Sequence, residues 1–269
     1  MEHLAGRVAV ITGAASGIGL GLADAFAEDG MLLVLADIDA TGLASAAARF
    51  DNAGVLPVVT DVGDAQAMAD LATAAMDAFG RVDVVANNAG VLTLGGQWET
   101  SLEDWRWVVD VNLWGVINGV RSFVPLLLAN RDGGHVVNTA SVGGLSASAF
   151  TGPYAATTHA VVGLSKGLRA EFAAVGANVG VTVACPGRVR TAMVANVNRK
   201  VSGVLRPEAQ AVIDALRAHE DSAMDPSEAG RLIRDAVVHN RFWVLPNGRS
   251  HLSVVQTEIA GLLAAIADS

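Results

Sequence analysis

The chain has 269 residues, enough for one large α/β domain or two small ones, and although 52% of them are hydrophobic, no uninterrupted apolar run approaches the roughly 20 residues that a membrane-spanning helix needs. A formal net charge of -9 argues against nucleic acid and anionic membrane surfaces as partners. Cys185 is the only cysteine, the six histidines show no ligand spacing, and the N-terminus carries no signal-peptide pattern, so we expect a cytoplasmic protein without a disulfide or a metal site.

Short β-branched or aliphatic runs alternate along the chain with longer alanine-rich segments of helical period. This alternation is typical of repeated βαβ units on a parallel sheet. It predicts seven strands, at residues 7–12, 32–37, 55–60, 82–87, 135–140, 179–184 and 241–245, and two long helices, at about 102–129 and 152–175. The least regular part, residues 191–225, is expected to be a lid within a single doubly wound α/β domain that spans residues 1–269.

The turn between the first strand and the first helix reads "TGAASGIG", residues 12–19. Gly13, Gly17 and Gly19 would let the backbone approach a pyrophosphate, which then meets free N–H groups at the helix N-terminus. Asp37 closes the second strand, where its carboxylate could accept hydrogen bonds from both hydroxyls of an adenosine ribose and would repel a 2′-phosphate. These features favour NAD over NADP. A structural turn followed by a surface aspartate is the simpler alternative.

Four further motifs follow in order: "DV" at 61–62, "NNAG" at 87–90, "VNLWG" at 111–115 and "PGRVRT" at 186–191. With them the chain resembles the short-chain dehydrogenase/reductase family over nearly its full length. The resemblance implies a Rossmann-type sheet, NAD at the strand ends, a small-molecule substrate, and a homodimer or homotetramer assembled through the two long helices. It implies cofactor contacts from Gly13, Ser16, Gly17, Ile18, Gly19, Asp37, Asp61, Val62, Asn88, Ala89, Gly90, Tyr154, Pro186, Gly187, Val189 and Thr191.

Within that set, the resemblance assigns each motif a part of the cofactor. Asp61 would bind the adenine amino group, with the backbone of Val62 beside it. Pro186 and Gly187 would lie against the nicotinamide, and Thr191 would hold its carboxamide.

The resemblance implies an active site of four residues, which are an asparagine, a serine, a tyrosine and a lysine. Asn112 and Ser141 match the first two, and Tyr154, the only tyrosine of the chain, follows Ser141 by 13 residues. Tyr154 would be the acid and base, and Ser141 would polarise the substrate oxygen. Each also has a structural reading: Asn112 as a helix kink, Ser141 as part of a loop, Tyr154 as packing.

Thr158 occupies the position of the family's lysine. Residues four apart share one face of a helix, so a lysine there would place its ammonium near the Tyr154 phenol and favour the phenolate. Lys166 lies about 18 Å further along the helix, and His159 points to another face, so neither replaces it. Three alternatives stay open: a dehydrogenase that tolerates the change, a reductase of a substrate such as an iminium ion, and a nucleotide-binding protein that has lost catalysis.

The segment from residue 173 to 206 contains no acidic residue. One hypothesis is that an arginine there meets an anionic group of the substrate. The alternative is that these cations are solvated or offset the pyrophosphate, and apolar neighbours suit an apolar substrate equally well. The cations are Arg188, Arg190, Arg199, Lys200 and Arg206, and the apolar residues are Met193, Val194, Val197 and Leu205.

Overall fold

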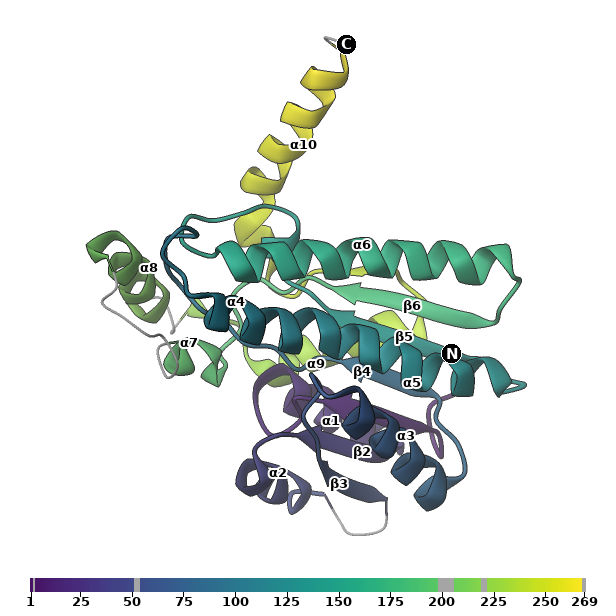
Figure 1. Ribbon diagram of the computed structural model, residues 1–269. Coiled ribbons are helices and arrows are strands. Elements are labelled where there is room, and N and C mark those ends of the chain that lie inside the picture. The colour runs from purple at the N-terminus through teal and green to yellow at the C-terminus, as the bar shows by residue number, and fades with distance from the viewer. Residues whose placement is uncertain (2, 51–53, 198–205, 219–221, 268–269) are drawn as a thin grey trace.

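The structure, a computed structural model, describes residues 1, 3–50, 54–197, 206–218 and 222–267. Its centre is one sheet of seven parallel strands in the order β3-β2-β1-β4-β5-β6-β7 (Figure 1). The strands are β1 (Val8–Thr12), β2 (Leu32–Asp37), β3 (Val55–Val59), β4 (Val84–Asn87), β5 (Gly134–Thr139), β6 (Val179–Ala184) and β7 (Trp243–Val244). Because the chain winds outward in both directions from β1 and β4, a crevice for a ligand is expected at the carboxyl ends of these two strands.

The helices fill the connections between the strands. They are α1 (Gly17–Glu28), α2 (Ala40–Ala47), α3 (Ala65–Phe79), α4 (Leu102–Val109), α5 (Gly115–Ala129), α6 (Gly152–Ala174), α7 (Ala192–Asn196), α8 (Pro207–Ala218), α9 (Pro226–Val238) and α10 (Leu252–Ala267). Four of them begin with a side-chain cap that accepts hydrogen bonds from the first turn, which fixes where the helix starts. The capping residues are Asp39, Asp64, Ser101 and Asp225.

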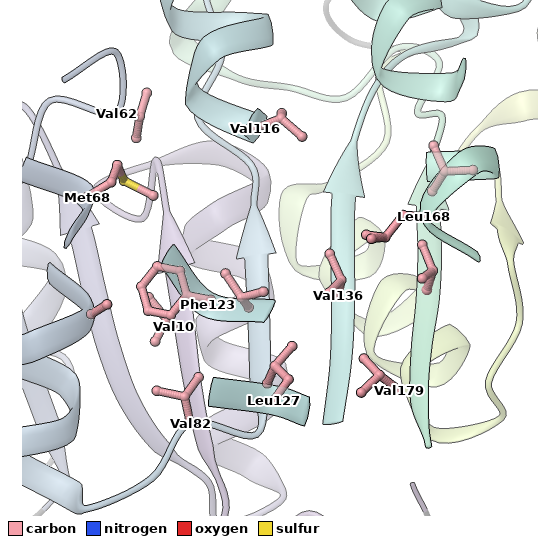
Figure 2. Close-up of a cluster of buried hydrophobic side chains, with 14 of the residues drawn as sticks. Val10, Val62, Met68, Val82, Val116, Phe123, Leu127, Val136, Leu168 and Val179 are labelled. Atoms are coloured by element: carbon pink, nitrogen blue, oxygen red, sulfur yellow. The ribbon is translucent and has the colours of Figure 1, made fainter. Parts of the chain in front are cut away.

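Alternate residues of β1 face opposite layers of helices. Val8 and Val10 point to the side covered by α3, α5 and α6, where Figure 2 shows Phe123 with its neighbours over the sheet. Ala9 and Ile11 point to the other side, which α1 and α9 cover. Since both faces are buried, the strand is apolar from Val8 to Ile11, as parallel strands in such folds are.

The predicted elements agree with the structure, with shifts at their ends. The expected strands at 32–37 and 179–184 match β2 and β6, and the expected helix at 152–175 matches α6 to one residue. The expected strand at 241–245 shrinks to two residues, because only Trp243 and Val244 pair with β6. The expected helix at 102–129 is one helical run, but a π-helical turn, Asp110–Trp114, separates α4 from α5.

Within the part of the chain that the structure describes, two helical stretches are long and apolar enough, by length and composition, to cross a membrane. Residues 102–129 form one, and part of that stretch is buried inside the fold. Residues 248–267 form the other, and none of it is buried. The sequence expectation considered only uninterrupted apolar runs, and polar residues interrupt both stretches.

Candidate active site

The turn from β1 to α1 leaves no room for side chains at two of its glycines. Gly13 has a φ of +67°, and a Cβ there would lie 2.8 Å from the Cα of Ala89. A Cβ on Gly19 would lie 2.2 Å from the carbonyl oxygen of Gly13. The turn therefore brings the first N–H groups of α1 close to the carboxyl end of β1, an arrangement that suits a phosphate group.

Thr191, the first residue of the expected lid, lies over this turn. A Cβ on Gly17, whose φ is +55°, would lie 2.9 Å from Cγ2 of Thr191. Ser16 is the N-cap of α1, and its hydroxyl makes no capping hydrogen bond. Ile18 packs against the core on the α1 side of the sheet. Four of the predicted cofactor residues thus lie together at one helix N-terminus.

The end of β1 is tied to the "NNAG" loop after β4 through Thr12. Its Oγ1 accepts hydrogen bonds from the backbone N–H groups of Asn88 (2.9 Å) and Ala89 (3.1 Å). The Asn88 side chain donates to the Thr12 carbonyl at 3.0 Å and accepts from the Thr139 hydroxyl at 3.2 Å. Thr12 was not among the predicted site residues; a hydroxyl at the last position of the strand before a glycine turn is the signal that could have found it.

Two carboxylates lie at the carboxyl ends of β2 and β3. Asp37 accepts a hydrogen bond from the Ala15 N–H through one oxygen and from the Asp39 N–H through the other, both at 3.0 Å. Asp61 is exposed and accepts from the Gly63 N–H at 2.9 Å, while the neighbouring Val62 is buried. Asp37 is thereby fixed in direction beside the glycine turn. Together, the narrow turn, the helix N-terminus and this carboxylate fit a dinucleotide.

The structure brings Ser141 and Tyr154 together beyond the end of β5. The Ser141 hydroxyl accepts a hydrogen bond from the Gly143 N–H at 3.0 Å and lies 3.5 Å from the carbonyl oxygen of Pro186. A Cβ on Gly143 would lie 3.5 Å from both the Ser141 hydroxyl oxygen and the Tyr154 ring, an ordinary contact distance, so Gly143 lies against both side chains. Burial raises the pKa of the Tyr154 phenol, and a hydrogen bond with Ser141 partly opposes that rise.

Asn112 lies in the π-helical turn and pins the loop after β4. Its Oδ1 accepts from the Val91 N–H at 2.8 Å, and its Nδ2 donates to the Val91 carbonyl at 2.9 Å. Nδ2 also lies 3.4 Å from the Thr157 hydroxyl on α6. Gly90 approaches the same side chain, since a Cβ there would lie 3.6 Å from Oδ1. The amide therefore ties the π-helical turn to the loop after β4 and to α6.

Thr158 is buried on α6, and its hydroxyl donates to the backbone carbonyls of Tyr154 (2.9 Å) and Ala155 (3.2 Å). Lys166 lies elsewhere, with its Nζ 5.5 Å from the ring centroid of the β7 tryptophan. His159 contacts the carbonyl of Ala155 through Nδ1 at 2.8 Å. Both nearby candidates for a replacement cation are thus engaged away from the phenol.

The loop after β6 is held by the segment that follows β7. A Cβ on Gly187 would lie 2.7 Å from the Asn247 carbonyl oxygen and 3.1 Å from the ring of His251. Val189 forms a short parallel bridge with Met224. His251 was not predicted as a site residue. It lies far along the chain from the motif "PGRVRT" at 186–191, so the sequence gave no signal for this contact.

Two arginines, one just before the lid and one within it, form ion pairs. Arg190 and Asp225 are paired through Nη2 and Oδ2, and both are about half exposed. Arg206 binds Glu99, with Nε 2.6 Å from Oε1, and lies over the Trp98 ring with 5.9 Å to the centroid. The first pair joins the two ends of the lid, and the second connects the lid to the loop after β4. Arg199, Lys200 and Leu205 lie outside the described residues.

An apolar cluster joins the expected lid to Tyr154. It is built from the loop after β4, from α7 and the residue that follows it, from α8 and from the first turn of α6. Its buried members are Leu92, Leu94, Val197 and Ile213, and Tyr154, Met193, Val212 and Leu216 pack against them. The surface next to the Tyr154 ring is therefore apolar.

A sequence profile of the family described as short chain dehydrogenase matches residues 7–202. The chain is 37% identical over 254 residues to 1-deoxy-11-beta-hydroxypentalenate dehydrogenase of Streptomyces exfoliatus, covering 93% of this chain and 86% of that protein. It is 32% identical over 258 residues to C alpha-dehydrogenase of a Sphingobium species, covering 91% and 82%.

Among solved structures, a short chain dehydrogenase/reductase from Burkholderia phymatum in complex with NAD is similar throughout. The two share 38% sequence identity with a TM-score of 0.89, covering 98% of this chain and 97% of the other. The profile and these relatives show that the chain belongs to the short chain dehydrogenase family, oxidoreductases that act with a nicotinamide cofactor.

Proposed function

We propose that this protein is an NAD-dependent dehydrogenase that interconverts a secondary alcohol and a ketone with a largely apolar body. The observation that carries the proposal is that the Ser141 hydroxyl and the Tyr154 ring lie together against Gly143, where a Cβ would be 3.5 Å from each, beside the apolar cluster that includes Tyr154. The relatives named as dehydrogenases, and the one solved with NAD, support the same reading.

The choice of NAD over NADP rests on Asp37. Its two oxygens already accept backbone hydrogen bonds, so the carboxylate is held in place at the end of β2. Each oxygen retains lone pairs for a ribose hydroxyl, whereas a phosphate on the 2′ position would bring two anions together. Gly13, Ser16, Gly17, Ile18 and Gly19 would hold the pyrophosphate, and Asp61, Val62, Asn88, Ala89, Gly90, Pro186, Gly187, Val189 and Thr191 the remaining contacts.

When bound, the nicotinamide ring supplies or accepts the hydride. In the reduction, the Tyr154 phenol would donate its proton to the substrate oxygen as negative charge develops there, and the Ser141 hydroxyl would donate a hydrogen bond to the same oxygen. In the oxidation, the Tyr154 oxygen must take a proton from the alcohol. Asn112 would act through the loop that it holds, and the apolar cluster would exclude water from the substrate.

Thr158 favours a second candidate function. Without a nearby cation, the Tyr154 phenol retains a raised pKa and is a weaker proton donor than in a site with a lysine. A cyclic iminium substrate already carries the positive charge that a carbonyl must acquire, so its reduction asks less of Tyr154. A protein that binds NAD but has lost catalysis is the remaining alternative.

One screen separates these functions. Calorimetry with NAD and NADP first establishes binding, and the absorbance of the reduced cofactor is then followed with secondary alcohols, ketones and cyclic imines. Turnover of an alcohol and its ketone supports the main proposal, and turnover of imines alone supports the second. NAD binding without turnover of any substrate leaves the non-catalytic alternative, and an absence of binding contradicts all three.

We also propose a homo-oligomer and a cytoplasmic location. A groove of about 370 Å³ runs between α5 and α6, with an apolar lining that includes Val124, Leu128 and Phe172. This groove is suited to a second copy of the same face, as the resemblance implied for the two long helices. Cys185 is buried and unpaired, which suits a reducing compartment.

A further inference from the structure

α10 projects away from the rest of the chain (Figure 1). Its large apolar side chains are exposed to solvent. None of its described residues is buried. The exposed fractions are 57% for Leu252, 52% for Ile259, 66% for Leu262 and 61% for Leu263. A monomeric protein in water rarely leaves this much apolar surface uncovered on one helix, so the surface indicates a partner.

The apolar residues of α10 follow the spacing of a helix–helix contact. Leu252, Val255, Ile259 and Leu262 are separated by three, four and three residues, which places them along one stripe of the helix. We call these four residues the α10 stripe, and Ile266 continues the same spacing. The opposite side carries Ser253, Thr257 and other small residues. A stripe with this period accepts the stripe of another helix.

We propose that α10 packs against α10 of a second copy of this chain, in a pair with two-fold symmetry. In such a pair one apolar stripe covers the other, so a single sequence satisfies both sides of the contact. A lipid surface suits the helix less well. α10 contains no lysine or arginine, Glu258 flanks the stripe, and the whole chain carries a charge of -9.

The size of α10 requires that the contact extend beyond it. A helix of 16 residues is about 24 Å long and about 10 Å wide, so one face offers on the order of 240 Å², against about 800 Å² for each partner of a typical stable interface. The neighbouring β7 and the residue that follows it supply more apolar surface, since Trp243 and Leu245 are each 40% exposed. Leu245 packs on Gly248, at the turn that leads into α10.

β7 is also the last strand of the sheet, and its outer edge has no strand partner among the described residues. Such an edge is usually covered or paired in a folded protein. A second copy that covers β7 and α10 together would therefore bury the exposed apolar side chains of Trp243 and Leu245 together with the α10 stripe. This interface differs from the groove between α5 and α6, and it does not depend on the catalytic function.

The test compares charge placed on the stripe with the same charge placed opposite. Ile259→Glu and Leu262→Glu put a carboxylate into the contact, and Thr257→Glu puts one on the far side of α10. The molar mass of each full-length variant is measured by light scattering after size exclusion, with circular dichroism and NAD binding as controls for folding. We expect both stripe variants to fall to half the mass of the wild-type assembly and Thr257→Glu to match the wild type.

Disulfide trapping gives a second readout that does not weaken the contact. Cys185 is buried, so an introduced cysteine would be the accessible one. We expect Ile259→Cys to form a covalent dimer under mild oxidation, and Thr257→Cys to form much less. A monomeric wild type, an unchanged mass in both stripe variants, or equal trapping at both positions overturns the proposal. So does flotation of the wild type with phospholipid vesicles that is lost in Ile259→Glu without a change in mass, which would assign the stripe to a membrane.

Discussion

The hydroxyl of Thr158 donates to the backbone carbonyl of Tyr154, 2.9 Å away on the same helix. Its hydrogen is therefore used inside α6 and is not available to a ligand unless the side chain rotates. Thr158 is only 4% exposed, and no charge from its side chain favours the phenolate of Tyr154. Burial therefore raises the pKa of the Tyr154 phenol, and the hydrogen bond with Ser141 opposes that rise.

We expect Thr158→Lys to raise the rate of alcohol oxidation at pH 7 by about 10- to 100-fold. An ammonium near the phenol favours the phenolate, and each unit by which the pKa falls is worth about a factor of ten in its population. Steady-state kinetics with a substrate from the screen measures the gain, and calorimetry checks that NAD binding is retained.

The matched control is Thr158→Met, which fills the same space with a long neutral side chain. If Thr158→Met raises the rate as much as Thr158→Lys, packing and not charge limits the wild type. If a folded Thr158→Lys gains nothing, the chemistry does not depend on ionised Tyr154, which would favour the imine reductase.

The two directions of the reaction should differ in their dependence on pH. Because the pKa of Tyr154 is raised above its usual value of about 10, the phenol is protonated between pH 6 and 9. Ketone reduction uses that protonated form and should be nearly flat, whereas alcohol oxidation needs the phenolate and should rise about tenfold per pH unit. Initial rates in both directions check this, and an oxidation rate that levels off near pH 7 would contradict it. Tyr154→Phe should abolish both.

Asp37→Asn should reduce the preference for NAD over NADP by about 10- to 100-fold. The carboxylate would lose its charge, and hydrogen bonds to charged groups contribute about 1.5–3 kcal/mol each. Dissociation constants for both cofactors measure the change. Asp39→Asn is the control, since Asp39 is an exposed acid two residues further on that caps α2. An unchanged ratio in Asp37→Asn, or an equal change in both variants, would remove Asp37 from the binding site.

Arginines near the lid should contribute little to substrate binding. Arg190 is already paired with Asp225, so we expect Arg188→Ala and Arg190→Ala to leave KM alike for acidic and neutral substrates. Met193→Ala should instead raise KM for apolar ketones about tenfold, because it removes a side chain of the apolar cluster worth about 1.5 kcal/mol when buried. A selective loss of acidic substrates in Arg188→Ala would restore the anion hypothesis.

Sequence alone predicted the sheet, because parallel strands that are buried on both faces must be apolar runs. It also predicted the glycine turn, because the backbone of such a turn excludes side chains. It could not predict the interactions that depend on three-dimensional register. The pinning of Val91 by Asn112 joins residues 21 apart, and the approach of His251 to Gly187 joins residues 64 apart. The pairing of Arg206 with Glu99 has no periodic signature either, since surface charges form no pattern that fixes a partner.

Buried His135 should make the protein less stable in acid. Its Nε2 lies 2.7 Å from the Thr182 hydroxyl, and burial lowers its pKa to about 3. The unfolded chain, with an ordinary pKa of about 6.5, binds the proton first, so stability is lost as the pH falls from about 6.5 toward 3, by about 2 kcal/mol at pH 5. Urea unfolding at pH 7 and pH 5 measures this loss. His135→Gln should lack this contribution, while His3→Gln at an exposed site should keep it; the same loss in His135→Gln would show that other groups cause it.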